Sequence, residues 1–133
     1  MAAISGFGNF VIYFATALAL VGFYLAVYTV ATAHNELALI RQNVVAAAVA
    51  LGLSLIGFAL PLASAIVYAQ SVPDLAVWGA VAALVQVVVF YLVRLAVPRL
   101  SERIAADELA PALFLGAASL AAGIINAASM SFG

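Results

Sequence analysis

The fold is decided by the stretch Asn43–Ser64, which reads NVVAAAVALGLSLIGFALPLAS and contains no charged residue. Its 22 residues are enough to cross a bilayer, since about 20 apolar residues span the hydrocarbon as a helix. Small and weakly polar residues recur in it at alternating steps of four and three, which places them on one helical face. This stripe consists of Asn43, Ala47, Ala50, Ser54, Gly57, Pro61 and Ser64.

Two uses of this stripe are open at the level of sequence. Small residues in membrane helices commonly let two backbones approach closely, so the stripe can be a packing seam. Weakly polar side chains can equally line a polar path across the membrane. Pro61 removes a backbone donor and predicts a kink close to Gly57.

The composition of the whole chain agrees with a membrane protein. Of its 133 residues 69% are hydrophobic and 7% charged, and the mean hydropathy is +1.31. A soluble domain needs a charged surface, so lipid must be the solvent here. The four arginines, the absence of lysine and the net charge of −1 give no basic field for nucleic acid.

The apolar runs predict one transmembrane domain over residues 1–133, an all-α four-helix bundle. The expected spans are about 10–33, 44–69, 75–97 and 112–130, and the first is expected to stay uncleaved. Between them, residues 34–42 and 98–108 have apolar spacings typical of short surface helices. In the second of these segments, Asp107, Glu108 and Pro111 are typical of a helix start.

Several residues inside the spans are candidates for helix packing or for lining a pore. Gln86 lies near the middle of the third span, where an amide must find a partner. The fourth span repeats the small stripe with Ala112, Gly116, Ser119, Gly123 and Asn126. The candidates are Asn43, Ser54, Gly57, Pro61, Ser64, Gln86, Gly116, Ser119, Gly123 and Asn126.

Other polar residues have simpler interpretations. Arg94 lies about one turn from the end of its span, so it is expected to snorkel outward or form an ion pair as a charge anchor. Tyr13, Tyr24 and Tyr28 share one face of the first span, and each can donate a hydrogen bond or sit at the interface. His34, the single histidine, is interpreted as an exposed loop residue.

The arginines also predict the orientation. Arg41, Arg94, Arg99 and Arg103 all fall on the side shared by the first and third loops. The positive-inside rule therefore places these loops in the cytoplasm and both termini outside.

The two halves of the chain resemble each other. Phe23-Tyr24-Leu25 recurs as Phe90-Tyr91-Leu92, and Ile40 and Asn43 recur as Ile104 and Asp107. The repeat units are about 10–69 and 75–130. Because each unit contains two spans, both point the same way, and the bundle is predicted to consist of two parallel two-helix repeats.

The run Ile40–Ile66, together with Trp78, Gln86 and the closing GIINAASM of Gly123–Met130, resembles the YjfL-like bacterial inner-membrane proteins, a family of unknown function. The resemblance implies a four-span inner-membrane protein with a two-fold repeat. It also implies a link with membrane stress, because some relatives are encoded near phage-shock-like genes. It supplies no catalytic residue.

These sequence features lead to two hypotheses about the function. One is an oligomerising interaction or structural component that binds copies of itself or another membrane protein in the bilayer. The alternative is a channel or transporter for ions or small solutes, lined by Asn43, Ser54, Gln86, Ser119 and Asn126 with Tyr13 and Tyr24. An enzyme is not expected, because the chain has no cysteine or lysine and only one histidine. No catalytic, cofactor-binding or metal-binding residue is predicted.

Overall fold

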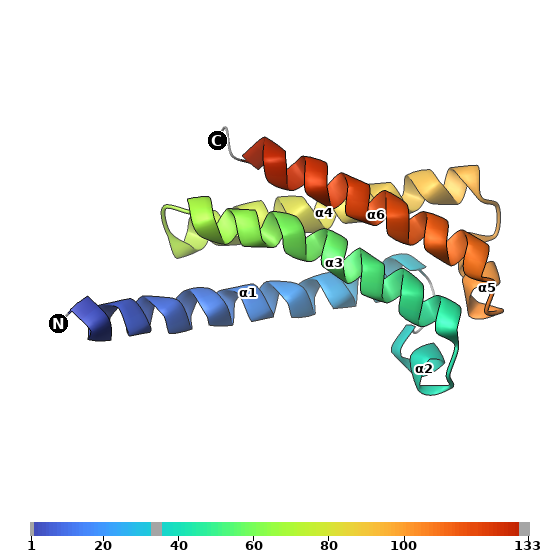
Figure 1. The fold of residues 1–133 in the computed structure, drawn as a ribbon, viewed down its shortest axis with the longest axis horizontal. Helices are drawn as coiled ribbons and strands as arrows, with labels where there is room; N and C mark the ends of the chain where they lie inside the picture. Colours follow the sequence, from blue (N-terminus) through green and yellow to red (C-terminus); the bar gives the residue numbers. More distant parts are fainter. Residues whose placement is uncertain (1, 33–35, 131–133) are drawn as a thin grey trace.

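The computed structural model describes residues 2–32 and 36–130, and these form an all-α bundle (Figure 1). Four long helices are joined by tight turns and two short helices. The elements are α1 (Ala2–Thr32), α2 (Glu36–Arg41), α3 (Val45–Tyr68), α4 (Val72–Ala96), α5 (Leu100–Ala105) and α6 (Leu109–Met130). The predicted fold class, a membrane four-helix bundle, is confirmed.

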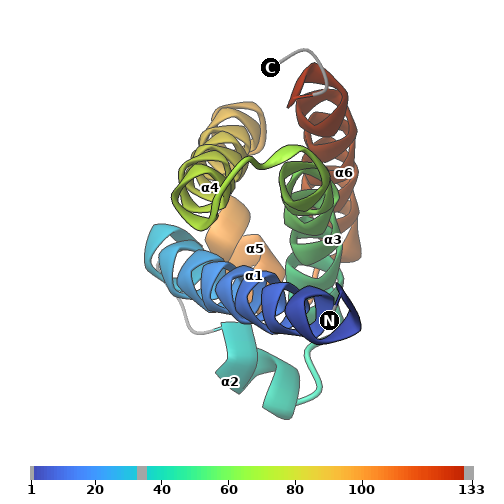
Figure 2. The same cartoon turned by 90° about the vertical axis from the view of Figure 1, so that its left-hand side faces the viewer.

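The four long helices are each long and apolar enough to cross a membrane, with mean hydropathies of 1.7 to 2.3. Helices α1 and α4 run in one direction and α3 and α6 in the other, with α3 between α1 and α6 (Figures 1 and 2). One end of the bundle, here called the arginine end, contains α2, α5 and all four arginines. The other, here called the far end, contains the α3–α4 turn and the end of α6.

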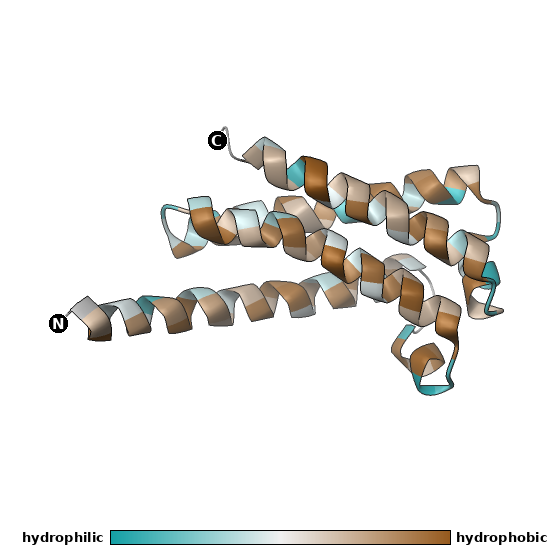
Figure 3. Ribbon diagram, in the orientation of Figure 1, coloured by the Kyte–Doolittle hydropathy of each residue, from teal (hydrophilic) through white to brown (hydrophobic). Residues whose placement is uncertain are grey.

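Hydrophilic residues lie mostly at the two ends of the bundle. Figure 3 shows them around α2 and α5 at the arginine end and in the α3–α4 turn at the far end, while the long helices are mostly hydrophobic. This distribution is typical of helices that cross the hydrocarbon with their connections in the interfaces.

Three of the long helices begin earlier than the apolar runs predict. Helix α1 begins at Ala2 rather than near residue 10, α4 at Val72 and α6 at Leu109. In α4 and α6 the reason is a proline, because Pro73 and Pro111 fit the first turn of a helix, where no intrahelical donor is needed. The hydroxyl of Ser71 also caps α4, accepting the Asp74 N–H at 3.3 Å.

The two expected surface helices are present as α2 and α5. In α5 the apolar face is turned inward, and Leu100 and Ile104 are fully buried under the bundle. Arg99, the residue before α5, forms a surface ion pair with Glu102 of that helix, at 2.6 Å. His34 lies outside the described residues.

The turns that lead into α3 and α6 have the same backbone conformation. Asn43 and Asp107 both have a φ of 65°, in the left-handed region that Asn and Asp tolerate. The N–H of Asn43 donates to the Ile40 carbonyl at 2.9 Å, and that of Asp107 to the Ile104 carbonyl at 3.0 Å. These positions are the ones that correspond in the two halves of the sequence.

Helix α3 is the centre of the bundle and α1 its most loosely attached member. Half of the most apolar window of α3 is buried inside the chain, against 11% for α1. Helix α1 contacts α4 where Leu20 packs on Gly79, and it contacts α3 through Tyr24. Most of the surface of α1 is therefore left for lipid or for another protein.

Candidate functional site

The predicted stripes of α3 and α6 meet at two glycines. A methyl group added to Gly57 would overlap the backbone carbonyl of Ser119, and one added to Gly123 would overlap the carbonyl of Gly57. Backbone atoms cannot give way as a flexible side chain can. Only glycine therefore fits these two positions at this helix separation.

Pro61 contributes to this contact from within α3. A proline at this position cannot donate to the carbonyl four residues earlier, so the Gly57 carbonyl loses its helical partner. That same carbonyl faces the Cα of Gly123. A close Cα–H···O contact partly replaces the missing hydrogen bond, which matters in a medium without water.

The contact between α3 and α6 continues on both sides of the glycines. Toward the arginine end, Leu53 packs on Gly116, where a methyl group would press on the Leu53 side chain rather than on backbone atoms. Toward the far end, the Ser64 hydroxyl donates to the Ala127 carbonyl at 3.1 Å. We call this contact, from Leu53 on Gly116 to Ser64 on Ala127, the glycine seam.

Gln86 reaches the glycine seam from α4. Its side chain is 2% exposed, and its Nε2 donates to the Ser119 carbonyl at 3.1 Å. Its Oε1 is buried and has no hydrogen-bond partner among residues 2–32 and 36–130. Within the bundle this amide therefore has a partner on its donor side alone.

A second polar contact joins α1 to α3. The hydroxyls of Tyr24 and Ser54, both fully buried, form a hydrogen bond. The Tyr24 ring stacks on Phe58 with the centroids 4.5 Å apart and the planes 9° from parallel. Tyr28 packs beside Tyr24, but its buried hydroxyl has no hydrogen-bond partner in the described part of the chain.

Two polar residues that the sequence places inside the membrane take part in neither the glycine seam nor the contact between Tyr24 and Ser54. Tyr13 lines an apolar groove between α1 and α3, apart from the Tyr24 hydroxyl. Asn126 is half-buried on α6, and its Nδ2 finds no partner within the described ranges.

Asn43 and Arg94 lie outside the bundle interior. Asn43 is exposed in the turn before α3, so it is not part of the helical stripe that the sequence predicted. Arg94 is exposed in the last turn of α4 and forms no ion pair with any residue that the structure describes. Its surroundings suit a side chain that extends toward the membrane surface.

One important contact was missed by sequence reasoning. Asp107 does not support the start of its own helix, because its Oδ1 accepts the Ala46 N–H in the first turn of α3, at 2.9 Å. Its carboxylate thus caps the other helix of the glycine seam. Asn43 and Asp107 occupy corresponding positions in the two halves of the sequence. That correspondence was the one signal that the turn before α6 could lie beside the turn before α3.

A buried carboxylate was also missed. Glu36 begins α2 and its side chain is fully buried, whereas the sequence patterns assigned it no role. It lies near Tyr28 of α1.

Chemically, these contacts join helices rather than form a reaction centre. Three side-chain hydrogen bonds link different long helices, namely Tyr24 with Ser54, Ser64 with Ala127 and Gln86 with Ser119, and the closest approach occurs where backbones touch. Residues 2–32 and 36–130 contain no group of three or more metal-ligating side chains.

Comparison with known proteins gives one family. A family model described as a domain of unknown function, DUF350, matches residues 1–130. The chain is 43% identical over 120 residues to the UPF0719 inner membrane protein YjfL of Escherichia coli K12, covering 90% of this chain and 91% of that protein. The same identity and coverage hold for the protein of that name from Escherichia coli O157:H7. No solved structure matches the chain.

Proposed function

The chain belongs to the DUF350 family and is an inner-membrane protein, and we propose that it acts as an oligomerising structural component of that membrane. In this proposal it has no enzymatic activity and binds copies of itself, or another membrane protein, through helix faces. A link with membrane stress remains a prediction from the resemblance.

The observation that carries the proposal is the direct contact between Gly57 and Gly123. Where two helix backbones touch, no room remains between them for a wet path. The Ser54 hydroxyl, the Gln86 Nε2 and the Ser119 carbonyl are engaged in contacts between helices. This supports a packing role for the two stripes and directs the search for an interaction surface to the outside of the bundle.

Helix α1 offers that surface. A line of exposed small residues follows it at steps of seven, four, three and four, directly opposite the face that holds Tyr24 and Tyr28. We call it the outer stripe; it consists of Gly8, Ala15, Ala19, Gly22 and Ala26. A methyl group added at Gly22 would meet nothing within 4 Å. A small, open face on a loosely attached helix suits close packing against a second α1.

The proposal includes the internal repeat. The matching turns at Asn43 and Asp107 and the parallel course of α3 and α6 support two equivalent units. It also includes the orientation, with the arginine end in the cytoplasm and both termini outside, which rests on the positive-inside rule.

The proposal is tested by the mass of the protein extracted from its membrane directly into lipid nanodiscs. We expect a dimer or larger species for the natural chain and a shift toward monomer for Gly22→Leu. Ala117→Leu, at an exposed small residue of α6, is the matched control and should leave the mass unchanged. Only monomer for the natural chain would contradict the proposal.

The alternative function, a channel or transporter, is favoured by a different observation. Three buried polar atoms have no partner among the described residues: Gln86 Oε1, Asn126 Nδ2 and the Tyr28 hydroxyl. Water or an ion could bind such groups in a conducting state. Liposomes that contain the protein and release ions or protons faster than empty ones, with the flux lost in Gln86→Leu, would establish this function instead.

A further inference from the structure

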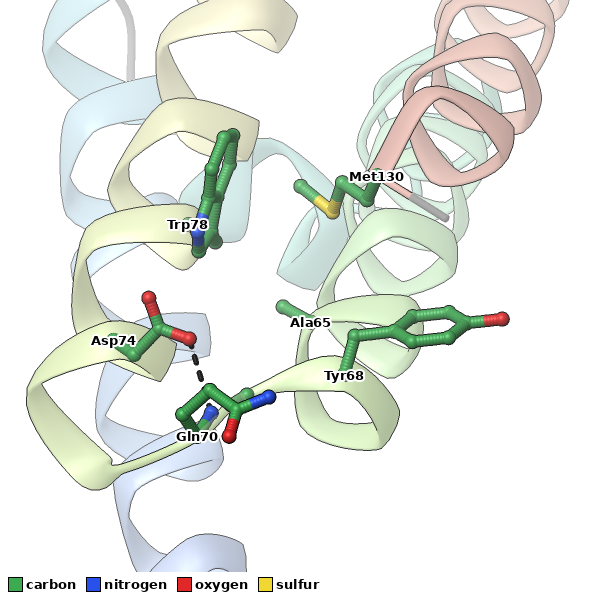
Figure 4. Close-up of a pocket in the computed structure, with 7 residues that line it drawn as sticks. Ala65, Tyr68, Gln70, Asp74, Trp78 and Met130 are labelled. Carbon is green, nitrogen blue, oxygen red and sulfur yellow. Dashed lines mark hydrogen bonds between the residues drawn. The ribbon is translucent and has the colours of Figure 1, made fainter. Parts of the chain in front are cut away.

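The far end of the bundle contains a cavity of about 190 Å³ that neither proposed function uses. It lies between the end of α3, the start of α4 and the last residue of α6. Figure 4 shows Asp74 and Trp78 on one side of it and Ala65 and Met130 on the other, with the Tyr68 ring directed away. It is smaller than a typical cofactor pocket and suits a ligand of a few heavy atoms.

The only charged residue that lines this cavity is the acidic Asp74. Asp74 is the only charged side chain in the described part of the chain that lies away from the arginine end. Every arginine is at the opposite end of helices that span the membrane, beyond the range of effective interaction. A negative charge without a counterion in the protein attracts a cation from its surroundings.

The Asp74 carboxylate is held in position and is not saturated. Its Oδ2 accepts the Gln70 N–H at 3.0 Å, while its own N–H donates to the Ser71 hydroxyl at 3.3 Å. Within the described ranges that carboxylate accepts no other hydrogen bond, although an ionised carboxylate has about four acceptor sites. The capping contacts at the start of α4 explain the conformation of the Asp74 side chain. They leave the remaining acceptor sites of its carboxylate free for a ligand.

The other lining residues define the shape of the cation. Trp78 follows Asp74 by one helical turn on the same face of α4, and indole faces attract cations. Met130 and Ala65 make the opposite wall apolar. A bare metal ion would gain nothing from this wall, whereas an ammonium group with a short carbon arm would contact both sides.

We propose that the cavity between Asp74, Trp78 and Met130 binds a primary ammonium group carried on a short carbon chain. The ammonium donates to Asp74 and lies near the indole, and the carbon arm packs on Met130. This chemistry occurs in the ethanolamine headgroup of membrane phospholipids and in free small amines.

Trp78 makes the test direct, because it is the only tryptophan of the chain. The full-length protein in phosphatidylglycerol nanodiscs would be titrated with ethanolamine while tryptophan fluorescence is recorded. We expect a saturable change with ethanolamine and none with ethylene glycol, which has the same size without the charge. Asp74→Asn keeps a capping side chain of the same volume and should weaken binding by about tenfold or more.

A second variant keeps the test valid if Asp74→Asn does not fold. Ala69→Leu fills the cavity from the α3 side without changing any charge, and it should abolish the response. Nanodiscs of phosphatidylethanolamine separate the two sources of the ligand. A response to ethanolamine that disappears in them identifies the lipid headgroup, and one that persists identifies a free amine. No saturable response, or equal affinity in the natural chain and in a folded Asp74→Asn, would overturn the proposal.

Discussion

The carbonyl oxygen of Gly57 lies against the Cα of Gly123, and neither position has room for a methyl group. Pro61 has no N–H, so the Gly57 carbonyl lacks its helical donor. The contact with Gly123 therefore brings α3 and α6 together and also shields this carbonyl from the hydrocarbon. The parallel pair of α3 and α6 is therefore the most closely packed part of the bundle. Helix α1 is the least buried of the four long helices, and we propose that it contacts a second copy of the chain.

Substitution at the glycine seam should weaken the bundle. Gly57→Ala and Gly123→Ala force α3 and α6 apart, and we expect each to lower the free energy of unfolding by about 1–3 kcal/mol. Unfolding in detergent, followed by circular dichroism, measures the change. Gly52→Ala is the control, since a methyl group there meets nothing within 4 Å and helix propensity favours alanine. Equal behaviour of all three variants would show that the backbones do not touch.

Tyr24 and Ser54 should be energetically coupled. Tyr24→Phe and Ser54→Ala each remove one partner of a buried hydrogen bond, so the double variant should lose less stability than the sum of the single ones. Hydrogen bonds between membrane helices lead us to expect a coupling of about 0.6–1.7 kcal/mol. The control cycle pairs Tyr24→Phe with Thr16→Ala, because Thr16 bonds only within α1. Strict additivity for Tyr24 and Ser54 would contradict the assigned bond.

Asp107 should stabilise α3 and not its own helix. Asp107→Gly keeps a residue that tolerates the positive φ but removes the oxygen that accepts the Ala46 N–H, at an expected cost of about 1 kcal/mol. Hydrogen exchange should then accelerate at Ala46. Asn43→Gly is the matched control, because Asn43 has the same φ of 65° and makes no side-chain cap within the described residues. Faster exchange at the start of α6 alone would contradict the assignment.

The orientation can be tested with single cysteines, because the chain has none of its own. Gln70→Cys at the far end and Gln42→Cys at the arginine end are both exposed in the structure. A membrane-impermeant maleimide added to intact spheroplasts should label Gln70→Cys and reach Gln42→Cys only after lysis. The reverse pattern would place the arginine end outside.

Much of this fold could be predicted from the sequence because the signals are local. Four apolar runs predict four spanning helices, and the spacing of Leu100 and Ile104 predicts a short helix with one apolar face. The small residues of α3 and α6 were also visible as stripes, since helical periodicity alone places them on one face.

The remaining contacts depend on how the helices are placed in three dimensions. Nothing local indicates that Asp107 reaches Ala46, which is far away in the sequence, or that Tyr24 rather than Tyr13 meets Ser54. The early start of α1 at Ala2 was missed because Gly6 and Gly8 weaken the helical signal, although membrane helices tolerate glycine. The burial of Glu36 follows from the fold of α2 against the bundle, which its loop-like composition concealed.

The most direct test of the account is disulfide formation between two copies of the chain in its native membrane. Ala19→Cys lies on the outer stripe of α1, and Ala117→Cys is an equally exposed alanine of α6. On oxidation we expect Ala19→Cys to form a covalent dimer at low expression level and Ala117→Cys to stay monomeric. Monomer from both variants, or dimer from Ala117→Cys alone, would contradict the claim that this protein assembles through α1.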